Sequence, residues 1–247
     1  MKTLFTSGFT WNSYYYKSIL IFFFSLSIYG AWGQTITSAG SGNWDSTTPN
    51  APWPGGIVPI AINDVIIASG TIVTVSDGTG TPSTHACNSI VVNGGGTLRT
   101  NSGTIARTLN VTVSLTISAG GTYTVVNPGG GAVTHFLNIG GDFTNNGGSF
   151  IPVNGNHSLL VTFNGGGNQA VNGTTATQTF NNIVVNKAGG LLSAGGSTTT
   201  INAANYTQTL GSFTSPATFS ATGTVTLTAG TFTAGANTNV GGDFSNN

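Results

Sequence analysis

Residues 96–126 read GTLRTNSGTIARTLNVTVSLTISAGGTYTVV, and this stretch begins and ends on the same local pattern. The pattern is a glycine, a small polar residue and a large apolar one, as in Gly96-Thr97-Leu98 and Gly121-Thr122-Tyr123. Between the two copies, β-branched and apolar residues alternate with polar ones, which is typical of half-buried strands. The stretch therefore predicts short strands that return at a regular interval.

The same three-residue pattern recurs along most of the chain. Counting the weaker matches Gln169-Ala170-Val171 and Gly190-Leu191-Leu192, copies begin at positions 96, 121, 148, 169, 190, 211 and 230. The interval between successive copies is thus 19 to 27 residues, and it is shorter in the second half of the series. A second repeat, IGGDFTNN at 139–146, returns as VGGDFSNN at 240–247. Self-similarity at such intervals is the sequence signature of stacked structural units.

The composition favours strands throughout. Runs typical of strands occupy residues 72–75, 90–92, 111–117, 123–126, 159–163, 183–185 and 224–228. Glu is absent and the other strong helix formers are scarce, so we expect essentially no helix. A coil of about 21 residues suits three short strands joined by Gly and Asn corners, which predicts a right-handed parallel β-helix. In it, Phe150, Phe213 and Phe232 would stack. The alternative is a β-sandwich of hairpins with Asn-Gly and Gly-Gly turns.

Charge is scarce, and this excludes several classes of function. Only 4% of the residues are charged and the formal net charge is +0. No basic face is available to neutralise phosphates, so we expect no nucleic-acid partner. Catalysis and metal binding both need several titratable groups in one pocket, and this chain has few to bring together. The single cysteine, Cys87, excludes an internal disulfide framework.

The N-terminus has the pattern of a targeting segment. Lys2 and Lys17 precede the apolar run from Ile19 to Ile28, and Ala31-Trp32-Gly33 follows it. The run is shorter than the roughly 20 apolar residues that a membrane span requires. Residues 1–33 are therefore interpreted as a signal peptide cleaved after Gly33, which predicts a secreted or cell-surface protein without membrane insertion.

The region after the signal peptide resembles a known protein family. Residues 41–75, SGNWDSTTPNAPWPGGIVPIAINDVIIASGTIVTV, resemble the opening of the eight-glycine domain in surface proteins that use type IX secretion. The GGDFTNN segment and TFNNIVVNK at 179–187 resemble the repeats of the same adhesin-like proteins. The resemblance implies an N-terminal cap at residues 34–85, with Trp44 and Trp53 in its core, and β-helix repeats at 86–247. We expect these repeats to continue beyond Asn247 in a longer protein.

The metal-ligating residue types do not form a recognisable motif. His85 and Cys87 lie close together, while His135 and His157 lie elsewhere, and zinc requires three or four ligands at defined spacing. We therefore expect a buried Cys87 with a turn histidine near the cap, and not a zinc site or an activated nucleophile.

Oxygen-bearing side chains give equally weak patterns. Asp142, Asn145 and Asn146 offer too few oxygens for Ca²⁺ and are interpreted as surface turns, as are Asp243 and its neighbours. Glycosidases need two carboxylates about 5 to 9.5 Å apart, and only Asp64 and Asp77 are plausible neighbours. Tyr123 and Tyr206 are weak candidates for stacking on sugars, although a place in the core fits both better. Thr-x-Thr strands also suggest a flat ice-binding array, but the pattern does not recur in every coil.

Together these observations predict a non-catalytic, secreted or cell-surface repeat module with an adhesive or structural role. Its uncharged Thr/Asn-rich surface would contact glycans or neighbouring proteins through many weak hydrogen bonds. We assign no catalytic, cofactor-binding or metal-binding residue from the sequence. The alternative function is a polysaccharide-degrading β-helix enzyme, either a lyase or a glycosidase, or the substrate-binding part of one.

Overall fold

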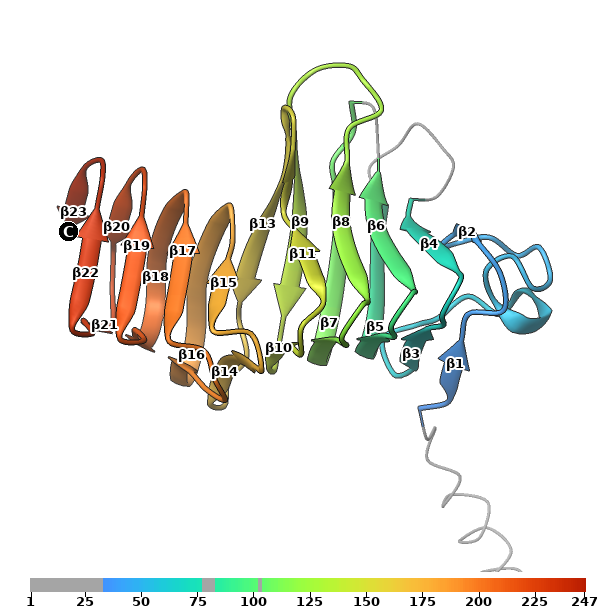
Figure 1. Ribbon diagram of the computed structural model, residues 1–247, viewed down its shortest axis with the longest axis horizontal. Coiled ribbons are helices and arrows are strands. Elements are labelled where there is room, and N and C mark those ends of the chain that lie inside the picture. The colour runs from blue at the N-terminus through green and yellow to red at the C-terminus, as the bar shows by residue number, and fades with distance from the viewer. Residues whose placement is uncertain (1–32, 77–82, 102–103) are drawn as a thin grey trace, which may run out of the picture. The chain divides into compact units, whose positions relative to one another are not determined.

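The computed structural model describes residues 33–76, 83–101 and 104–247 (Figure 1). The predicted signal peptide, residues 1–33, therefore lies outside the described residues except for Gly33. Within the described ranges the chain forms strands, with one 3-10 turn, η1 (Pro54–Gly56), and no α-helix. None of the described residues forms a helix long and apolar enough to cross a membrane.

The strands form three sheets. Sheet A contains β1 (Thr35–Thr37), β3 (Asp64–Ile67), β5 (Ser83–Val92), β7 (Arg107–Ile117), β9 (Val133–Ile139), β10 (Phe143–Asn145), β12 (Val153–Asn154), β13 (His157–Phe163), β14 (Gln169–Gly173), β16 (Asn182–Ala194), β18 (Asn205–Thr214), β20 (Val225–Leu227), β21 (Thr231–Thr233) and β23 (Phe244–Asn246). Sheet B contains β2 (Gly42–Asn43), β4 (Ile72–Val75), β6 (Thr97–Asn101), β8 (Thr122–Val126) and β11 (Ser149–Ile151). Sheet C contains β15 (Thr177–Thr179), β17 (Thr200–Ala203), β19 (Thr218–Ala221) and β22 (Asn237–Val240).

The chain is a parallel β-helix, as the repeat predicts. Nearly all strands pair in parallel with a strand of a neighbouring coil, for example β3 with β5 and β5 with β7. The one antiparallel pair among the described strands is β12 with β13. Two facing layers of hairpins are therefore absent from the described chain, and the alternative β-sandwich is wrong.

Each full coil has three flanks. The long strands of sheet A bend, so that their first halves pair with β9 and β13 on the first flank. Their second halves pair with β10 and β14 on the second flank. Sheet B forms the third flank of the early coils and sheet C forms that of the later ones, as Figure 1 shows along the near side of the molecule. The expected coil of three short strands is present, with the first two often fused.

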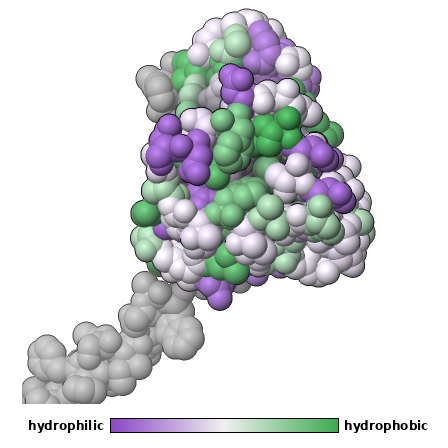
Figure 2. Space-filling model, turned by 90° about the vertical axis from the view of Figure 1, so that its left-hand side faces the viewer, coloured by the Kyte–Doolittle hydropathy of each residue, from purple (hydrophilic) through white to green (hydrophobic). Residues whose placement is uncertain are grey.

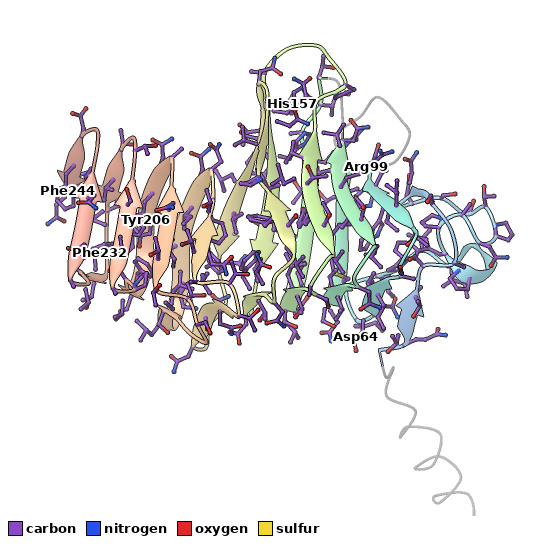
Figure 3. The ribbon with its side chains drawn as sticks, viewed as in Figure 1. Asp64, Arg99, His157, Tyr206, Phe232 and Phe244 are labelled. Carbon is purple, nitrogen blue, oxygen red and sulfur yellow. The ribbon has the colours of Figure 1, made fainter. Side chains whose placement is uncertain are left out.

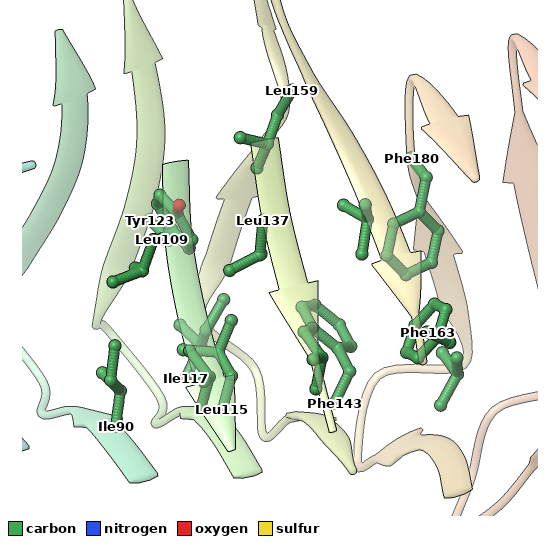
Figure 4. Close-up of a cluster of buried hydrophobic side chains, with 14 of the residues drawn as sticks. Ile90, Leu109, Leu115, Ile117, Tyr123, Leu137, Phe143, Leu159, Phe163 and Phe180 are labelled. Atoms are coloured by element: carbon green, nitrogen blue, oxygen red, sulfur yellow. The ribbon is translucent and has the colours of Figure 1, made fainter. Parts of the chain in front are cut away.

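Inward residues stack in columns along the axis. On the second flank, Ile90 is in register with Leu115, Leu115 with Phe143, and Phe143 with Val171. All four side chains are buried. Figure 4 shows three of them, Ile90, Leu115 and Phe143, in a cluster of buried hydrophobic side chains. The intervening residues point outward, because successive side chains of a strand alternate between its faces. One coil alone could not bury this apolar surface, so each coil depends on its neighbours.

The three-residue pattern correctly predicts which large apolar residues are in register within the early coils and within the late coils. Its prediction fails where the early coils meet the late ones. Leu98, Tyr123 and Phe150 are in register on the third flank, as the repeat predicts. Leu192, Phe213 and Phe232 are in register too, but on the second flank. The two series therefore lie on different flanks. The coil that links them is longer than the later ones, since Phe143 pairs with Val171 whereas Phe213 pairs with Phe232.

The expected stacking of three phenylalanines is correct only for two of them. Phe213 and Phe232 are in contact, with ring centroids 5.5 Å apart, and Tyr206 and Phe219 complete their cluster. Phe150 belongs to a separate cluster with Tyr123, Phe143 and Phe180. The reason is the change of flank: the repeat fixes which residue points inward, but not which side of the coil carries it.

The region interpreted as a cap contains strands of the β-helix. Trp44 and Trp53 are fully buried and pack edge to face with centroids 5.2 Å apart, which confirms that both are core residues. However, β3 and β4 already pair in register with the strands of the next coil. The expected boundary at residue 85 also falls within β5. Regular coil pairing thus begins before that boundary, because the strands of this region use the same sheets.

Candidate functional site

Two of the described carboxylates, those of Asp64 and Asp142, join neighbouring coils. Asp64 accepts hydrogen bonds from Asn88 Nδ2 (2.8 Å) and Ser89 Oγ (2.5 Å), both in the following coil. The bonds from Ser89 and Asn88 lower the pKa of Asp64, which favours the ionised form over the protonated form that a general acid needs. Asp142 accepts from the backbone N–H of Ala170, again one coil later, at 2.7 Å. The suggested partner Asp77 lies outside the described residues. Figure 3 shows Asp64 near the N-terminal end of the coil.

The predicted buried cysteine is confirmed, but the histidine beside it is not in a turn. Cys87 and His85 both lie on β5 and point inward, and both are buried. Burial raises the pKa of the Cys87 thiol, and the nearby Asp64 carboxylate raises it further. A thiol held in its neutral form is a poor nucleophile and a poor metal ligand. His85 packs against Trp44, with ring centroids 6.0 Å apart, and so belongs to the packing next to the cap.

The structure brings together two histidines that are distant in the sequence. His135 on β9 and His157 on β13 are fully buried, with ring centroids 5.8 Å apart. Arg107 donates its backbone N–H to His135 Nδ1 at 3.1 Å. Burial, His157 and the positive charge of Arg107 lower the pKa of His135 to about 4. The same cationic neighbour opposes a metal ion, and the described residues contain no group of three potential ligands.

Tyr123 and Tyr206 are fully buried, which confirms their place in the core and removes them as platforms for sugars. Burial raises the pKa of both hydroxyl groups.

The interpretation of Asn145 as a surface turn is wrong. Asn145 lies in β10, is buried, and donates from Nδ2 to Gln178 Oε1 at 3.3 Å. Its side chain faces inward because it alternates with Thr144.

An uncharged cleft lies on the outer face of sheet A. It has a volume of about 390 Å³ and is lined by β7, by the end of β9 and by the glycine-rich turn that follows β13. Asn110 and Asn138 are in register on neighbouring strands, and Asn138 Nδ2 donates to Asn110 Oδ1 at 2.8 Å. Asn164 and Gly165 form the opposite wall. The described lining offers amide groups and no ionised side chain, which suits binding of a neutral polar molecule and does not suit acid–base chemistry.

A buried lysine holds the wall of this cleft. Lys187 is fully buried, and its Nζ donates to the carbonyl oxygens of Gly165 and Gly167, each at 2.8 Å, and to Gln169 Oε1 at 2.6 Å. Gln169 Nε2 in turn donates to the carbonyl oxygen of Ile139, at 2.9 Å, beneath the cleft. Burial lowers the pKa of Lys187, and the three acceptors compensate for its lost hydration. Lys187 therefore joins the glycine-rich turn to Gln169, and through Gln169 to the end of β9.

The sequence alone does not reveal this cleft. Asn110, Asn138 and Asn164 recur at nearly the same interval as Leu115 and Phe143, which are in register on adjacent coils. That spacing is the available signal, but Asn is so common in this chain that it does not stand out. Lys187 is one of only five Lys and Arg residues, and the sequence around it forms no motif that indicates a role at a cleft. A comparison with protein-family models, curated proteins and solved structures finds no match to the chain.

Proposed function

We propose that this protein is a non-catalytic, secreted or cell-surface repeat module that acts by adhesion through its outer face. The observation that carries the proposal is the difference in residue type between the inward and the outward positions of the coil. Most inward positions are filled by apolar and aromatic side chains, while most outward positions of sheet A are uncharged and polar, as with Asn110, Asn138 and Thr207. A rigid face with many neutral hydrogen-bonding groups suits avid, low-affinity contacts.

The state of the titratable groups supports adhesion over catalysis. Asp64 and Asp142 are both engaged in bonds between coils, and Cys87 is buried with a raised pKa. A glycosidase needs one carboxyl group with a raised pKa to act as the acid, whereas the pKa of Asp64 is lowered. The partners that fit are glycans or neighbouring proteins. The predicted signal peptide supports an exported location.

A turnover screen tests this proposal against the enzymatic alternative. The full chain is incubated with a panel of bacterial and plant polysaccharides, and new reducing ends and unsaturated products are measured. We expect no product above the level of a heat-denatured sample. Products formed by the wild type and abolished by Asp64→Asn or Asp77→Asn would overturn the proposal in favour of a polysaccharide-degrading enzyme.

A further inference from the structure

The cleft on sheet A has the size of a small-ligand site and open hydrogen-bonding groups. Its volume of about 390 Å³ lies within the roughly 300–1,000 Å³ typical of such sites. Asn138 donates to Asn110, so Asn110 Nδ2 keeps its donors and Asn138 Oδ1 its acceptor capacity. Among the described residues neither of these atoms has another protein partner, and the exposed side chain of Asn164 makes no hydrogen bond.

In a second cavity, by contrast, the side-chain amides already have protein partners. It has a volume of about 280 Å³ and lies where sheet B ends and sheet C begins. Its two amides already bond to protein: Asn145 Oδ1 accepts from the N–H of Gly148, and Asn145 Nδ2 donates to Gln178. Gln178 Nε2 donates to the carbonyl oxygen of Thr175. The larger cleft is thus the one whose amides remain available to a ligand.

An exposed aromatic ring lies beside the open amides. Phe136 precedes Asn138 by two positions on β9, so both side chains point outward on the same face. Phe136 is 37% exposed, and its neighbours in register are Thr108 and Leu160. A sugar ring presents hydroxyl groups at its edge and C–H groups on its face, and therefore complements an amide pair next to an aromatic surface.

We propose that this cleft binds a neutral glycan, with Asn110, Asn138 and Asn164 bonding to sugar hydroxyls and Phe136 packing against the face of an adjoining ring. The inference rests on the proposed adhesive function and names its ligand class and site. None of the described residues that line the cleft is charged, so an anionic glycan gains no ionic partner there. The contacts of Lys187 with Gly165 and Gly167 keep the wall in place before the ligand arrives, which reduces the entropy lost on binding.

An extended peptide fits this site less well. Peptides that bind sheets usually add a strand to a free edge and gain backbone hydrogen bonds there. At the cleft, β9 is already paired on both sides, with β7 and with β13. A peptide would therefore contact side chains only, whereas a glycan uses side-chain amides as its normal partners.

The test begins with an array of neutral oligosaccharides, anionic oligosaccharides and uncharged peptides, probed with the full chain. The neutral oligosaccharide that binds best is then titrated calorimetrically into the wild type and into Phe136→Ala, Asn138→Ala and Asn164→Ala. Asn182→Ala is the matched control, because Asn182 accepts from Asn205 at 2.9 Å on the same sheet and does not line the cleft. Asn164 is exposed and makes no side-chain hydrogen bond within the described part of the chain, so its variant remains informative if Asn138→Ala does not fold.

We expect binding of neutral oligosaccharides that weakens about tenfold in each cleft variant, as loss of one hydrogen bond or stacking contact predicts, and less than about twofold in Asn182→Ala. Glycan binding that all three cleft variants retain would overturn the site and leave the adhesive function standing. An array silent toward every glycan would overturn the glycan inference, with adhesion to proteins still open to its own test. Cleft-dependent binding of peptides or anionic glycans alone would overturn the ligand class.

Discussion

Residues 139–146 and 240–247 have almost the same sequence, yet their phenylalanines have opposite surroundings. Phe143 is fully buried and packs against Phe150 and Phe180, with ring centroids 5.0 and 5.2 Å away. Phe244 is 56% exposed. Figure 2, which looks onto the end of the coil that carries Phe244, shows apolar side chains gathered in the middle of that face.

The backbone of the two segments is nevertheless alike. The carbonyl oxygen of Asp142 accepts from the N–H of Leu115 at 3.0 Å, and that of Asp243 accepts from Val225 at 2.9 Å. The difference lies in the neighbours, because β10 pairs with both β7 and β14, whereas β23 pairs only with β20 among the described strands. The motif thus determines the local conformation, while the adjacent coils determine burial and stability.

The largest expected effect comes from removing the two rings. Phe143→Ala should reduce the free energy of unfolding by about 3–5 kcal/mol, because it leaves a cavity in a packed aromatic cluster. Phe244→Ala should reduce it by less than about 1 kcal/mol, because the ring is largely in water already. Chemical denaturation of both variants measures the difference. Equal losses would mean that the two segments do not differ as described.

An acid titration separates the coils around residues 139–146 from the C-terminal coils by a different property. The pKa of His135 is about 4 in the folded chain, below its ordinary value of 6.5, so the unfolded chain binds the proton more tightly. Neutral His135 therefore makes its full contribution to the free energy of unfolding above pH 6.5. This contribution is lost as the pH falls toward 4, by roughly 3 kcal/mol in all.

The groups that face His135 are His157 and Arg107, so the effect belongs to the coils around β7, β9 and β13. His135→Gln keeps a side-chain acceptor for the Arg107 N–H and removes the titration. Denaturation between pH 7.5 and 4 should show a smaller loss of stability in this variant than in the wild type. An identical pH dependence in the two proteins would place the acid sensitivity elsewhere.

The two aspartates of the repeated segment give the smallest expected effect. Asp142→Ala removes the acceptor of the Ala170 N–H and should cost about 1–2 kcal/mol. Asp243→Ala should leave the stability unchanged, since the Asp243 side chain is exposed and makes no hydrogen bond to another described residue. Thermal unfolding of the pair is the measurement, and a larger loss in Asp243→Ala would reverse the comparison.

The comparison also explains what the sequence could predict. Strand runs such as 72–75 and 123–126 are local, and alternation alone identifies their inward residues, so the parallel β-helix follows from the pattern. Which flank a residue occupies depends on the length of each coil. The pattern Gly-polar-apolar is the same on every flank, and for this reason the sequence wrongly places Phe150 in the column of Phe213.

The cleft is beyond the same reasoning. Its three asparagines come from two adjacent coils and a turn, and they meet only if each coil has its actual length. The role of Lys187 depends on the fold of a distant glycine-rich turn, which no local pattern encodes. Sequence reasoning therefore identifies an uncharged outer face and leaves the position of its binding site open.

Hydrogen exchange at β10 and β23 tests the central claim, that adjacent coils supply the protection that the repeated segment lacks by itself. The two strands have nearly identical sequences, so their amides have nearly equal intrinsic exchange rates, and only the surroundings differ. In the native full chain, the amides of Phe143–Asn145 should exchange at least about tenfold more slowly than those of Phe244–Asn246. Equal protection of the two segments would contradict this account.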